Sequence, residues 1–450
     1  MKRYRIFLLV IAFALLFSGC APKVSPPGQM PPPPPPGGMA EAPEHYDAVI
    51  TFEKDDTRAG EHVSSSGDDE SAVLVTDGTV KLTDMTVERT SEQTGESDAY
   101  SFFGIGAAVL STGGTLSFEG GSIQTDAIGG AGLFAYKDGT IHAKDCRIVT
   151  RKNLSGGLHV AGGGILVAEN VSAETYGRSS APIRSDRGGG NMQVIGGSFL
   201  AHGDGSPAVY CTADITVQDA VLEATGAEAV CVEGRNSLTL KDCVLTGKLP
   251  EDDRNDLSWT VIVYQSLSGD AEIGKGAFRM EGGRLVSKNG GLFYTTNTES
   301  QITLTGVELS YSDRCDFFLA CLGNTNARQW GTPGQNGARC EFTAKQQSMQ
   351  GDVLWDDCST LDFRMEEASE LTGAFRRDNR FSGNGTGGAA SLFISEDSRW
   401  IVTGDSVLSA LENKGCIQDP EGNAVPVVTP DGKVLAEGTS VYTITVERLG

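Results

Sequence analysis

The sequence lacks the short motifs on which many catalytic and nucleotide-binding sites are built. No C-x-x-C pair occurs in it. The glycine run Gly188 to Gly190, in "SDRGGGNMQ", does not have the G-x-G-x-x-G spacing of a dinucleotide-binding loop. Neither "GKL" at Gly247 nor "GKG" at Gly274 continues as the "GK[ST]" of a Walker A loop. These absences argue against a phosphate-binding loop and against a cysteine zinc site.

Histidine and basic residues are scarce. The five histidines are scattered with no nucleophile motif beside them, so a catalytic triad is not expected. Asp and Glu number 59 against 36 Lys and Arg, which gives a formal net charge of -23. A surface this acidic repels nucleic acid and anionic lipid. The sequence therefore predicts no nucleic-acid partner and no cofactor, and a Ca²⁺ site is possible but has no support in the spacing of the carboxylates.

The N-terminus is where the sequence indicates a cellular location. The apolar run from Ile6 to Phe17 is too short to span a bilayer, whose hydrocarbon core is roughly 30 Å thick, and three basic residues precede it, as in a secretory signal peptide. The following "FSGC" resembles the lipobox of bacterial lipoproteins. That resemblance implies a signal peptide at 1–19, a lipidated Cys20, and an extracytoplasmic protein anchored to the membrane at the cell surface. A plain signal peptide cut elsewhere, with Cys20 lost, is the alternative.

Residues 20–45 are rich in proline, with the run "PPPPPP" at their centre. Proline has no N–H to donate and a fixed φ, so this segment is expected to be an extended spacer rather than part of a sheet. Recognition of an aromatic groove by the prolines is the alternative. Next to a lipid anchor, a spacer would hold the rest of the chain away from the membrane.

The rest of the chain is repetitive. Phrases such as "AVLSTGGTLSFEGGSI" and "AVCVEGRNSLTLKDCVL" return in about twelve copies, each with three short strand patterns separated by turns. Successive copies are separated by 25, 25, 26, 23 and 23 residues, measured between the residues that open the second turn of each copy: Gly120, Asp145, Asn170, Gly196, Asp219 and Asp242. Longer copies are expected to carry their extra residues at one corner: Thr90 to Gly104, Lys248 to Ser258, and Asn324 to Ala338.

This pattern predicts an all-β, right-handed, single-stranded parallel β-helix of about 12 coils, with each strand about 4.8 Å from its equivalent in the next coil. The helix is expected to span 72–416, between an N-terminal cap at 46–71 and a C-terminal β cap at 417–450, because exposed strand edges must be covered. Cys146 and Cys243 share one position of the repeat with Ala220. We expect these cysteines to be small core residues that lie too far apart to bond.

The repeats resemble secreted bacterial adhesin-like proteins with the right-handed β-helix of the pectate-lyase-like superfamily. The resemblance covers roughly residues 46 to 416. It rests on the phrases "SDRGGG", "SPAVYCTADITV", "EGRNSLTL", "YQSLSGDAEIG", "YTTNT" and "QWGTPGQNG". It implies the fold but transfers no activity to individual residues.

Aligned copies place polar residues at one position, directly after the first strand. These residues are Asp186, Thr212, Glu233, Gln265, Thr295 and Asp356. Stacked coils would arrange them as a polar stripe, with Arg187 and Arg235 beside it. The alternative is that these residues are polar because the corner is exposed to water, with surface or intercoil ion pairs between Asp186 and Arg187 and between Glu233 and Arg235.

Catalysis has only weak support in the sequence. A polysaccharide lyase would need carboxylates for Ca²⁺ and a base, which Asp186, Arg187, Glu233 and Arg235 could supply, but their spacing is not diagnostic. A glycoside hydrolase would need two carboxyl groups about 5 to 9.5 Å apart. Two adjacent pairs are candidates for that role, although neighbouring strand residues face opposite sides: Asp252 with Asp253, and Asp356 with Asp357.

The expected function is therefore binding rather than catalysis. Trp330 lies in the glycine-rich segment "ARQWGTPGQNG", where it could meet a sugar ring or a protein, or fold inward as a small loop core. We predict binding of a glycan or a surface protein at Asp186, Arg187, Glu233, Arg235, Gln265 and Trp330, or at the loops near Arg254 and Asp270. A lyase or hydrolase of pectate-lyase-like fold is the alternative.

Overall fold

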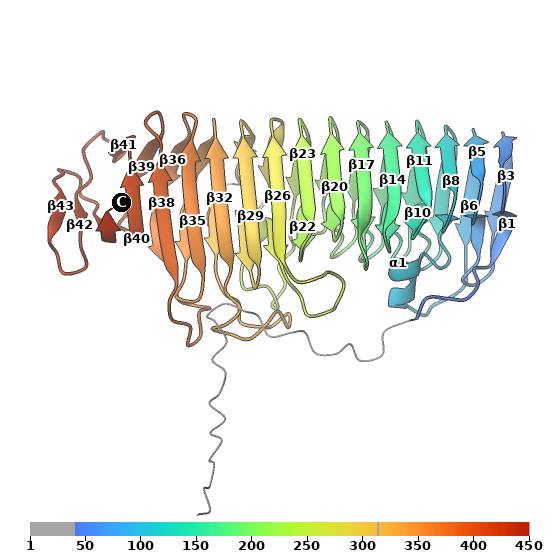
Figure 1. Ribbon diagram of the computed structural model, residues 1–450, viewed down its shortest axis with the longest axis horizontal. Coiled ribbons are helices and arrows are strands. Elements are labelled where there is room, and N and C mark those ends of the chain that lie inside the picture. The colour runs from blue at the N-terminus through green and yellow to red at the C-terminus, as the bar shows by residue number, and fades with distance from the viewer. Residues whose placement is uncertain (1–40, 313–314, 450) are drawn as a thin grey trace, which may run out of the picture. The chain divides into compact units, whose positions relative to one another are not determined.

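The computed structural model describes residues 41–312 and 315–449. The predicted signal peptide, Cys20 and most of the proline-rich segment lie outside these residues. The described chain is a solenoid of short parallel strands with one short helix, α1 (Asp98–Phe103) (Figure 1). No helix among the described residues is long and apolar enough to cross a membrane.

Each coil contributes one strand to each of three long parallel sheets. In every sheet a strand pairs with the equivalent strand of the preceding and the following coil. Sheet A holds thirteen strands: β1 (Ala48–Phe52), β4 (Ser71–Val75), β7 (Val109–Ser111), β10 (Leu133–Tyr136), β13 (Leu158–Ala161), β16 (Ile183–Ser185), β19 (Val209–Cys211), β22 (Val230–Glu233), β25 (Trp259–Tyr264), β28 (Gly291–Thr296), β31 (Leu319–Cys321), β34 (Val353–Trp355) and β37 (Phe375–Arg377).

Sheet B follows sheet A in each coil. Its strands are β2 (Asp56–Ala59), β5 (Thr79–Thr83), β8 (Thr115–Glu119), β11 (Thr140–Lys144), β14 (Gly164–Glu169), β17 (Gly190–Ile195), β20 (Asp214–Gln218), β23 (Ser237–Lys241), β26 (Lys275–Glu281), β29 (Glu299–Thr305), β32 (Arg339–Lys345), β35 (Thr360–Glu366), β38 (Ala389–Ile394) and β40 (Ser406–Asn413).

The third side of the coils is formed by sheet C and, in the later coils, by sheet D. Sheet C contains β3 (His62–Ser65), β6 (Thr86–Thr90), β9 (Ser122–Asp126), β12 (Arg147–Thr150), β15 (Ser172–Thr175), β18 (Ser198–Ala201), β21 (Val221–Ala224), β24 (Val244–Gly247), β27 (Arg284–Ser287) and β30 (Glu308–Ser310). Sheet D contains β33 (Ser348–Gln350), β36 (Glu370–Gly373), β39 (Arg399–Val402) and β41 (Cys416–Gln418).

The two ends of the solenoid differ. Residues 46–71, predicted as a cap, contain β1, β2 and β3, which pair in parallel with the next coil and so form a first coil of their own. At the other end β42 (Val427–Val428) and β43 (Val434–Ala436) form an antiparallel hairpin. The last strand, β44 (Ile444–Leu449), pairs in parallel with β40 and β42, so residues after 417 leave the three-strand repeat.

The predicted repeat spacing equals the sequence separation between paired residues of neighbouring strands in sheet B. Thr115 pairs with Thr140, and each following step of the ladder repeats the separations 25, 25, 26, 23 and 23. The turn residues that the spacing was measured from have left-handed backbone, with φ between 50° and 69°: Gly120, Asp145, Asn170, Gly196, Asp219 and Asp242. Glycine, asparagine and aspartate tolerate this conformation best, which explains why they alternate there.

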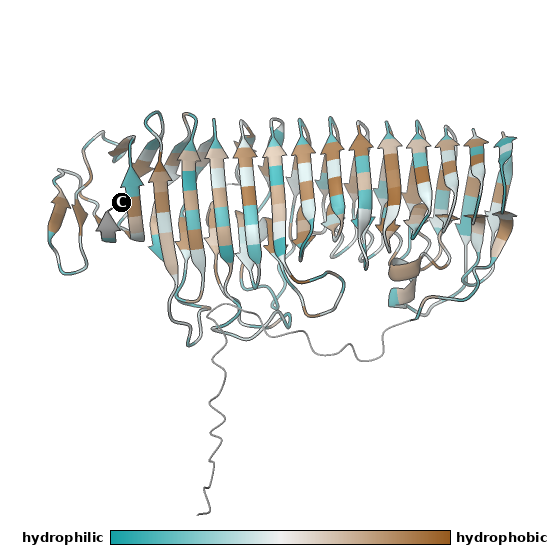
Figure 2. Ribbon diagram, in the orientation of Figure 1, coloured by the Kyte–Doolittle hydropathy of each residue, from teal (hydrophilic) through white to brown (hydrophobic). Residues whose placement is uncertain are grey.

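The interior is a column of apolar side chains that runs from coil to coil. Cys146 and Cys243 are buried in it, as predicted, and Ala220 lies at the same level of its own coil. Aromatic rings fill the later coils, with Phe342 stacked on Phe363 at a centroid distance of 4.6 Å. Figure 2 shows the resulting bands of hydrophobic residues, which recur at similar heights on successive strands.

The sequence suggested that the three insertions share one corner of the coil, but they lie at two different corners. Thr90 to Gly104 and Lys248 to Ser258 lie between sheet C and sheet A, whereas Asn324 to Ala338 follows sheet A. Both corners border sheet A. Long loops from either corner can therefore fold over the outer face of this sheet, which is the side that points away from the coil interior.

Candidate functional site

The outer face of sheet A carries two apolar covers. Near the N-terminal end, Phe102 and Phe103 of α1 pack on Leu110 and Phe134 of the sheet; we call this the α1 cover. Farther along, loop residues pack on the outward side chains of β25 and β28; we call this the loop cover, formed by Leu249, Leu257 and Trp330. A gap remains between the two covers.

A cavity of about 710 Å³ occupies this gap. α1 and its N-terminal flank form one wall, and residues 266–273, after β25, contribute to another. The floor consists of outward side chains from successive coils, among them Arg184 on β16 and Tyr210 on β19. The lining also includes Glu96, Asp98, Ser101, Phe102, Arg178, Ser179, Asp186, Ser268 and Asp270. We call it the first cavity.

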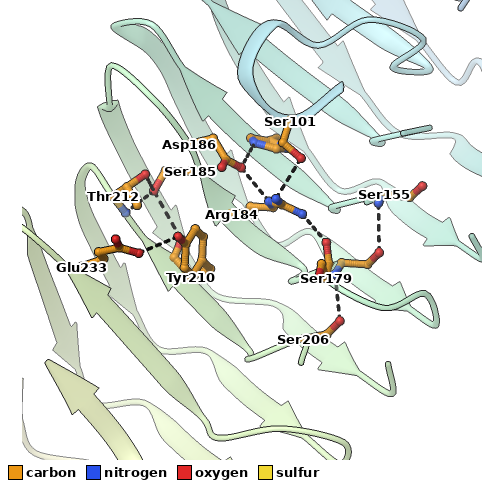
Figure 3. Close-up of polar contacts among 12 residues, drawn as sticks. Ser101, Ser155, Ser179, Arg184, Ser185, Asp186, Ser206, Tyr210, Thr212 and Glu233 are labelled. Atoms are coloured by element: carbon orange, nitrogen blue, oxygen red, sulfur yellow. Dashed lines mark hydrogen bonds and ion pairs between the residues drawn. The ribbon is translucent and has the colours of Figure 1, made fainter. Parts of the chain in front are cut away.

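Arg184 connects the floor to the walls. Its Nε donates to Asp186 Oδ2 at 2.7 Å, and its Nη2 donates to Ser101 Oγ of α1 at 2.8 Å. Its Nη1 donates to the carbonyl of Ser179 (Figure 3). Its side chain is only 9% exposed. Arg184 is therefore a structural cation that fixes the position of α1 over the sheet.

Asp186 is hydrogen-bonded to His159, which belongs to the preceding coil. His159 Nε2 lies 3.0 Å from Asp186 Oδ2, and the imidazole stacks on the Phe134 ring at 4.1 Å. Burial lowers the pKa of His159 to about 4, so the neutral ring donates from Nε2 and Nδ1 has no partner among the described residues. Burial opposes ionisation of Asp186, but the charge of Arg184 and the bond from His159 hold its pKa below the ordinary value.

Glu233 lies beneath the cavity wall and is fully bonded. Its Oε2 accepts from the hydroxyls of Tyr210 and Tyr264, each at 2.9 Å. Its Oε1 accepts from the backbone N–H of Ser266, at 3.2 Å, and from the Ser266 hydroxyl. Burial raises the pKa of Glu233, and these four bonds oppose that rise. The carboxyl group thus anchors residues 266–273 to the sheet.

Asp270 and Arg187 meet at the rim. Burial, together with the nearby charges of Asp186 and Glu233, raises the pKa of Asp270 to about 7. Arg187 Nε donates to the carbonyl of Gly269 at 3.2 Å, and its guanidinium lies 4.1 Å from the centroid of the Phe102 ring. Arg187 therefore links the α1 cover to the loop that carries Asp270.

A second cavity of about 420 Å³ adjoins the first, and both are lined by Tyr210. Trp330 faces it and packs against Tyr264 and Trp259, with ring centroids 4.6 Å and 6.3 Å away. The Nε1 of Trp259 has no hydrogen-bond partner among the described residues, although this side chain is buried. Trp330 thus belongs to a small loop core, one of the two predicted alternatives, and it also lines a cavity.

Two acidic residues form the polar contacts that hold the insertions of the loop cover together. Asp252, proposed as half of a catalytic pair, binds Arg254 at 2.6 Å and Arg328 at 3.1 Å. Asp256 accepts two bonds from Thr325, at 2.7 and 2.6 Å. These contacts join the two insertions that form the cover.

The predicted polar stripe is correct at some coils and one residue out of register at others. Glu233 is paired with Tyr264, and Tyr264 with Thr296. Thr295 therefore faces inward, where its hydroxyl lies 2.8 Å from that of Ser300. Gln265 is buried beyond the strand end and lines neither cavity.

The predicted ion pairs are also different in the structure. Asp186 binds Arg184 and His159 rather than Arg187. Arg235 binds Glu272 on the surface instead of Glu233, and it lies outside the first cavity.

Asp356 and Asp357 do not form a catalytic pair on one face. Asp356 is buried and accepts from the backbone N–H of Gly323 at 2.8 Å, whereas Asp357 binds Arg377. Their side chains therefore stabilise the later coils separately.

The floor residues Arg184 and Tyr210, and the buried His159 beside them, were not predicted from the sequence. Arg184, His159 and Tyr210 stack in one outward column of sheet A. The available signal was strand alternation, because Arg184 precedes Asp186 by two positions and therefore shares its face. The walls could not be predicted from strand alternation, because they come from segments outside the repeat whose sequences have no periodic pattern.

No set of three or more His, Cys, Asp or Glu side chains in the described part of the chain is arranged to hold a metal ion. Comparison with known protein-family models and with curated proteins finds no match. The function is therefore inferred from the geometry of the two cavities.

Proposed function

We propose that this protein is a lipid-anchored binding protein, displayed at a bacterial cell surface, that binds an uncharged glycan along the outer face of sheet A. The observation that carries the proposal is the first cavity. Its volume of about 710 Å³ lies within the usual range for ligand sites, roughly 300 to 1,000 Å³. Its polar floor is already fixed by hydrogen bonds, so little ordering would accompany binding.

The chemistry of the lining favours a ligand rich in hydroxyl groups. Serine hydroxyls, carboxylates and guanidinium groups are mixed there with the ring of Phe102. The adjoining second cavity adds the rings of Trp259 and Trp330 and an unpaired indole N–H. Aromatic faces and directed polar groups together suit a sugar, which has both C–H faces and hydroxyl edges.

The charge of the lining disfavours an anionic glycan. The first cavity is lined by four acidic side chains and two arginines. One arginine, Arg184, binds Asp186, and the other, Arg178, binds Glu96. A polyuronate would therefore meet net negative charge, which counts against a lyase that acts on such a polymer.

A glycoside hydrolase is the second candidate because of one specific observation. Asp186 and Asp270 line the same cavity, and their surroundings shift the two pKa values in opposite directions, that of Asp270 to about 7. One protonated and one ionised carboxyl group is the arrangement that glycoside hydrolysis uses. We rank it second because Asp186 is only 2% exposed and is occupied by His159 and Arg184.

A glycan array with the full-length chain carrying Cys20→Ser would test the proposal. We expect binding to neutral glycans and weaker binding to uronates. Release of reducing ends from each bound glycan is measured in parallel. Turnover that Asp270→Asn abolishes while binding persists would replace the binding proposal with the hydrolase, and failure to bind any glycan would overturn both.

The anchor is tested separately by labelling cells with a fatty acid. The wild-type chain is expected to incorporate the label and to fractionate with membranes. Cys20→Ser should abolish the incorporation, because a lipobox cysteine is the acylated residue. A chain that stays unlabelled, or a label that survives this substitution, would contradict a lipid anchor at Cys20.

A further inference from the structure

Two cysteines lie inside one coil, at the corner between sheets A and B. Cys321 ends β31 and Cys340 is the second residue of β32, and both are buried. The Cys321 thiol lies 4.0 Å from the carbonyl oxygen of Ala338, two residues before Cys340. The chain between them is the insertion that carries Trp330 and completes the loop cover.

The preceding coil shows how close side chains come at this corner. Cys321 pairs in register with Thr295, and Cys340 pairs with Ser300. The hydroxyl oxygens of Thr295 and Ser300 are 2.8 Å apart. Because parallel strands keep their register, we expect the same corner of the next coil to bring the side chains of Cys321 and Cys340 close together.

We propose that Cys321 and Cys340 form a disulfide bond that closes the base of the Trp330 insertion. The proposal depends on the proposed export of the protein, because disulfides persist in oxidising compartments. It does not depend on what the cavities bind.

The bond requires a disulfide oxidant, such as oxidised glutathione or an exported disulfide oxidoreductase. One cysteine thiolate attacks the oxidant, whose S–S bond breaks and releases one thiol. The second cysteine then attacks the mixed disulfide, forms the Cys321–Cys340 bond and releases the other thiol. The protein loses two electrons and two protons, and the oxidant is reduced to two thiols.

The timing of the reaction follows from burial. Burial raises the pKa of the Cys321 thiol well above its ordinary value, and the neighbouring Cys340 thiol adds to this effect. A thiol in the finished core is therefore a poor nucleophile. The bond is expected to form while the corner is still open during folding, and the same burial then shields it from reductants.

Cys358 is the competing partner to consider. It belongs to the next coil and lies near this corner, since a Cβ built on Gly323 would be 2.8 Å from its Sγ. Its thiol hydrogen-bonds Asp356 at 3.4 Å, and burial raises its pKa to about 12. Burial and Asp356 therefore keep this sulfur protonated, and its hydrogen bond to Asp356 occupies it.

The experiment uses the full-length chain with Cys20→Ser, refolded with a mixture of oxidised and reduced glutathione or with reductant alone. Free thiols are alkylated after denaturation, and peptides are mapped by mass spectrometry. With the oxidant we expect one cross-link, between Cys321 and Cys340. The other seven of the nine described cysteines should be alkylated.

Matched variants exclude misfolding as an explanation. The double variant Cys321→Ser/Cys340→Ser should fold, because Thr295 and Ser300 place the same kind of hydroxyl pair at this corner of the preceding coil. It should lose the cross-link, whereas Cys243→Ser should keep it. Two free thiols in an oxidised chain with native circular dichroism, or a bond to Cys358, would overturn the disulfide. Loss of glycan binding with the bond intact would count only against the proposed function.

Discussion

Asp219 shows how a single backbone conformation shapes the sequence of this solenoid. It opens the turn between sheets B and C with φ of 54°, and Asp242 and Gly196 have the same left-handed backbone in neighbouring coils. Its side chain is exposed, so the position is chosen for backbone conformation rather than for packing. For this reason the spacing of these turn residues in the sequence matches the length of each coil.

Substitutions at Asp219 should follow the backbone. Asp219→Gly is expected to change the free energy of unfolding by less than about 1 kcal/mol. Asp219→Val should lower it by about 1–2 kcal/mol relative to the glycine variant, because a β-branched residue is strained there. Denaturant unfolding of both variants measures the difference. Equal stability of the two would show that the left-handed backbone does not select the residue.

His159 should titrate far below its ordinary range. Its pKa in the fold is about 4, against about 6.5 in an unfolded chain. An NMR titration should place one imidazole near pH 4, and His159→Gln should remove that signal. A signal of His159 that titrates near 6.5 would contradict its burial beneath Asp186.

The same shift makes stability depend on pH. Between pH 6.5 and 4 the unfolded chain binds a proton that folded His159 does not, so this contribution is complete above pH 6.5. It is lost as the pH falls, by up to about 3 kcal/mol. Asp270, whose pKa is raised to about 7, acts in the opposite sense over an overlapping range. The His159 contribution is therefore measured as the difference between wild type and His159→Gln.

At the scale of the strands, period-two alternation predicted most of the architecture and failed where polar residues face inward. Thr295 was assigned to the outer stripe by the alignment of the copies, yet it is buried with its hydroxyl bonded to Ser300. A shift of one residue moves a side chain to the opposite face of a strand. The same one-residue error placed Gln265 in the predicted stripe, where the structure has Tyr264.

The loop cover should act as one unit because its two insertions are bonded to each other. Asp256→Ala removes both bonds to Thr325, so hydrogen exchange of the amides at 325–330 should become faster. Asp253→Ala is the matched control, because Asp253 takes no part in those bonds. Unchanged exchange in the Asp256 variant, or equal acceleration in both, would mean that these bonds do not hold the insertions together.

For the whole molecule, the repeat made the β-helix predictable and left the site largely unpredicted. Asp186, Arg187 and Glu233 were identified because they lie near a fixed position of the coil. Asp186 lines the first cavity, whereas Arg187 and Glu233 bond to the 266–273 segment that carries Asp270. The walls depend on α1 and on residues 266–273, whose aperiodic sequences gave no register to follow. The proposed function therefore depends largely on segments that interrupt the repeat.

The claim that the first cavity on sheet A is the ligand site is tested most directly by blocking it. Ser268 is an exposed residue of the cavity lining, and Ser198 is an exposed residue of β18 in sheet C. Binding of the array-selected glycan is measured for wild type, Ser268→Trp and Ser198→Trp, with circular dichroism as the test of folding. We predict that Ser268→Trp weakens binding at least about tenfold, which corresponds to about 1.4 kcal/mol, while Ser198→Trp binds like wild type. Undiminished binding by a folded Ser268→Trp chain would contradict the assignment of the site.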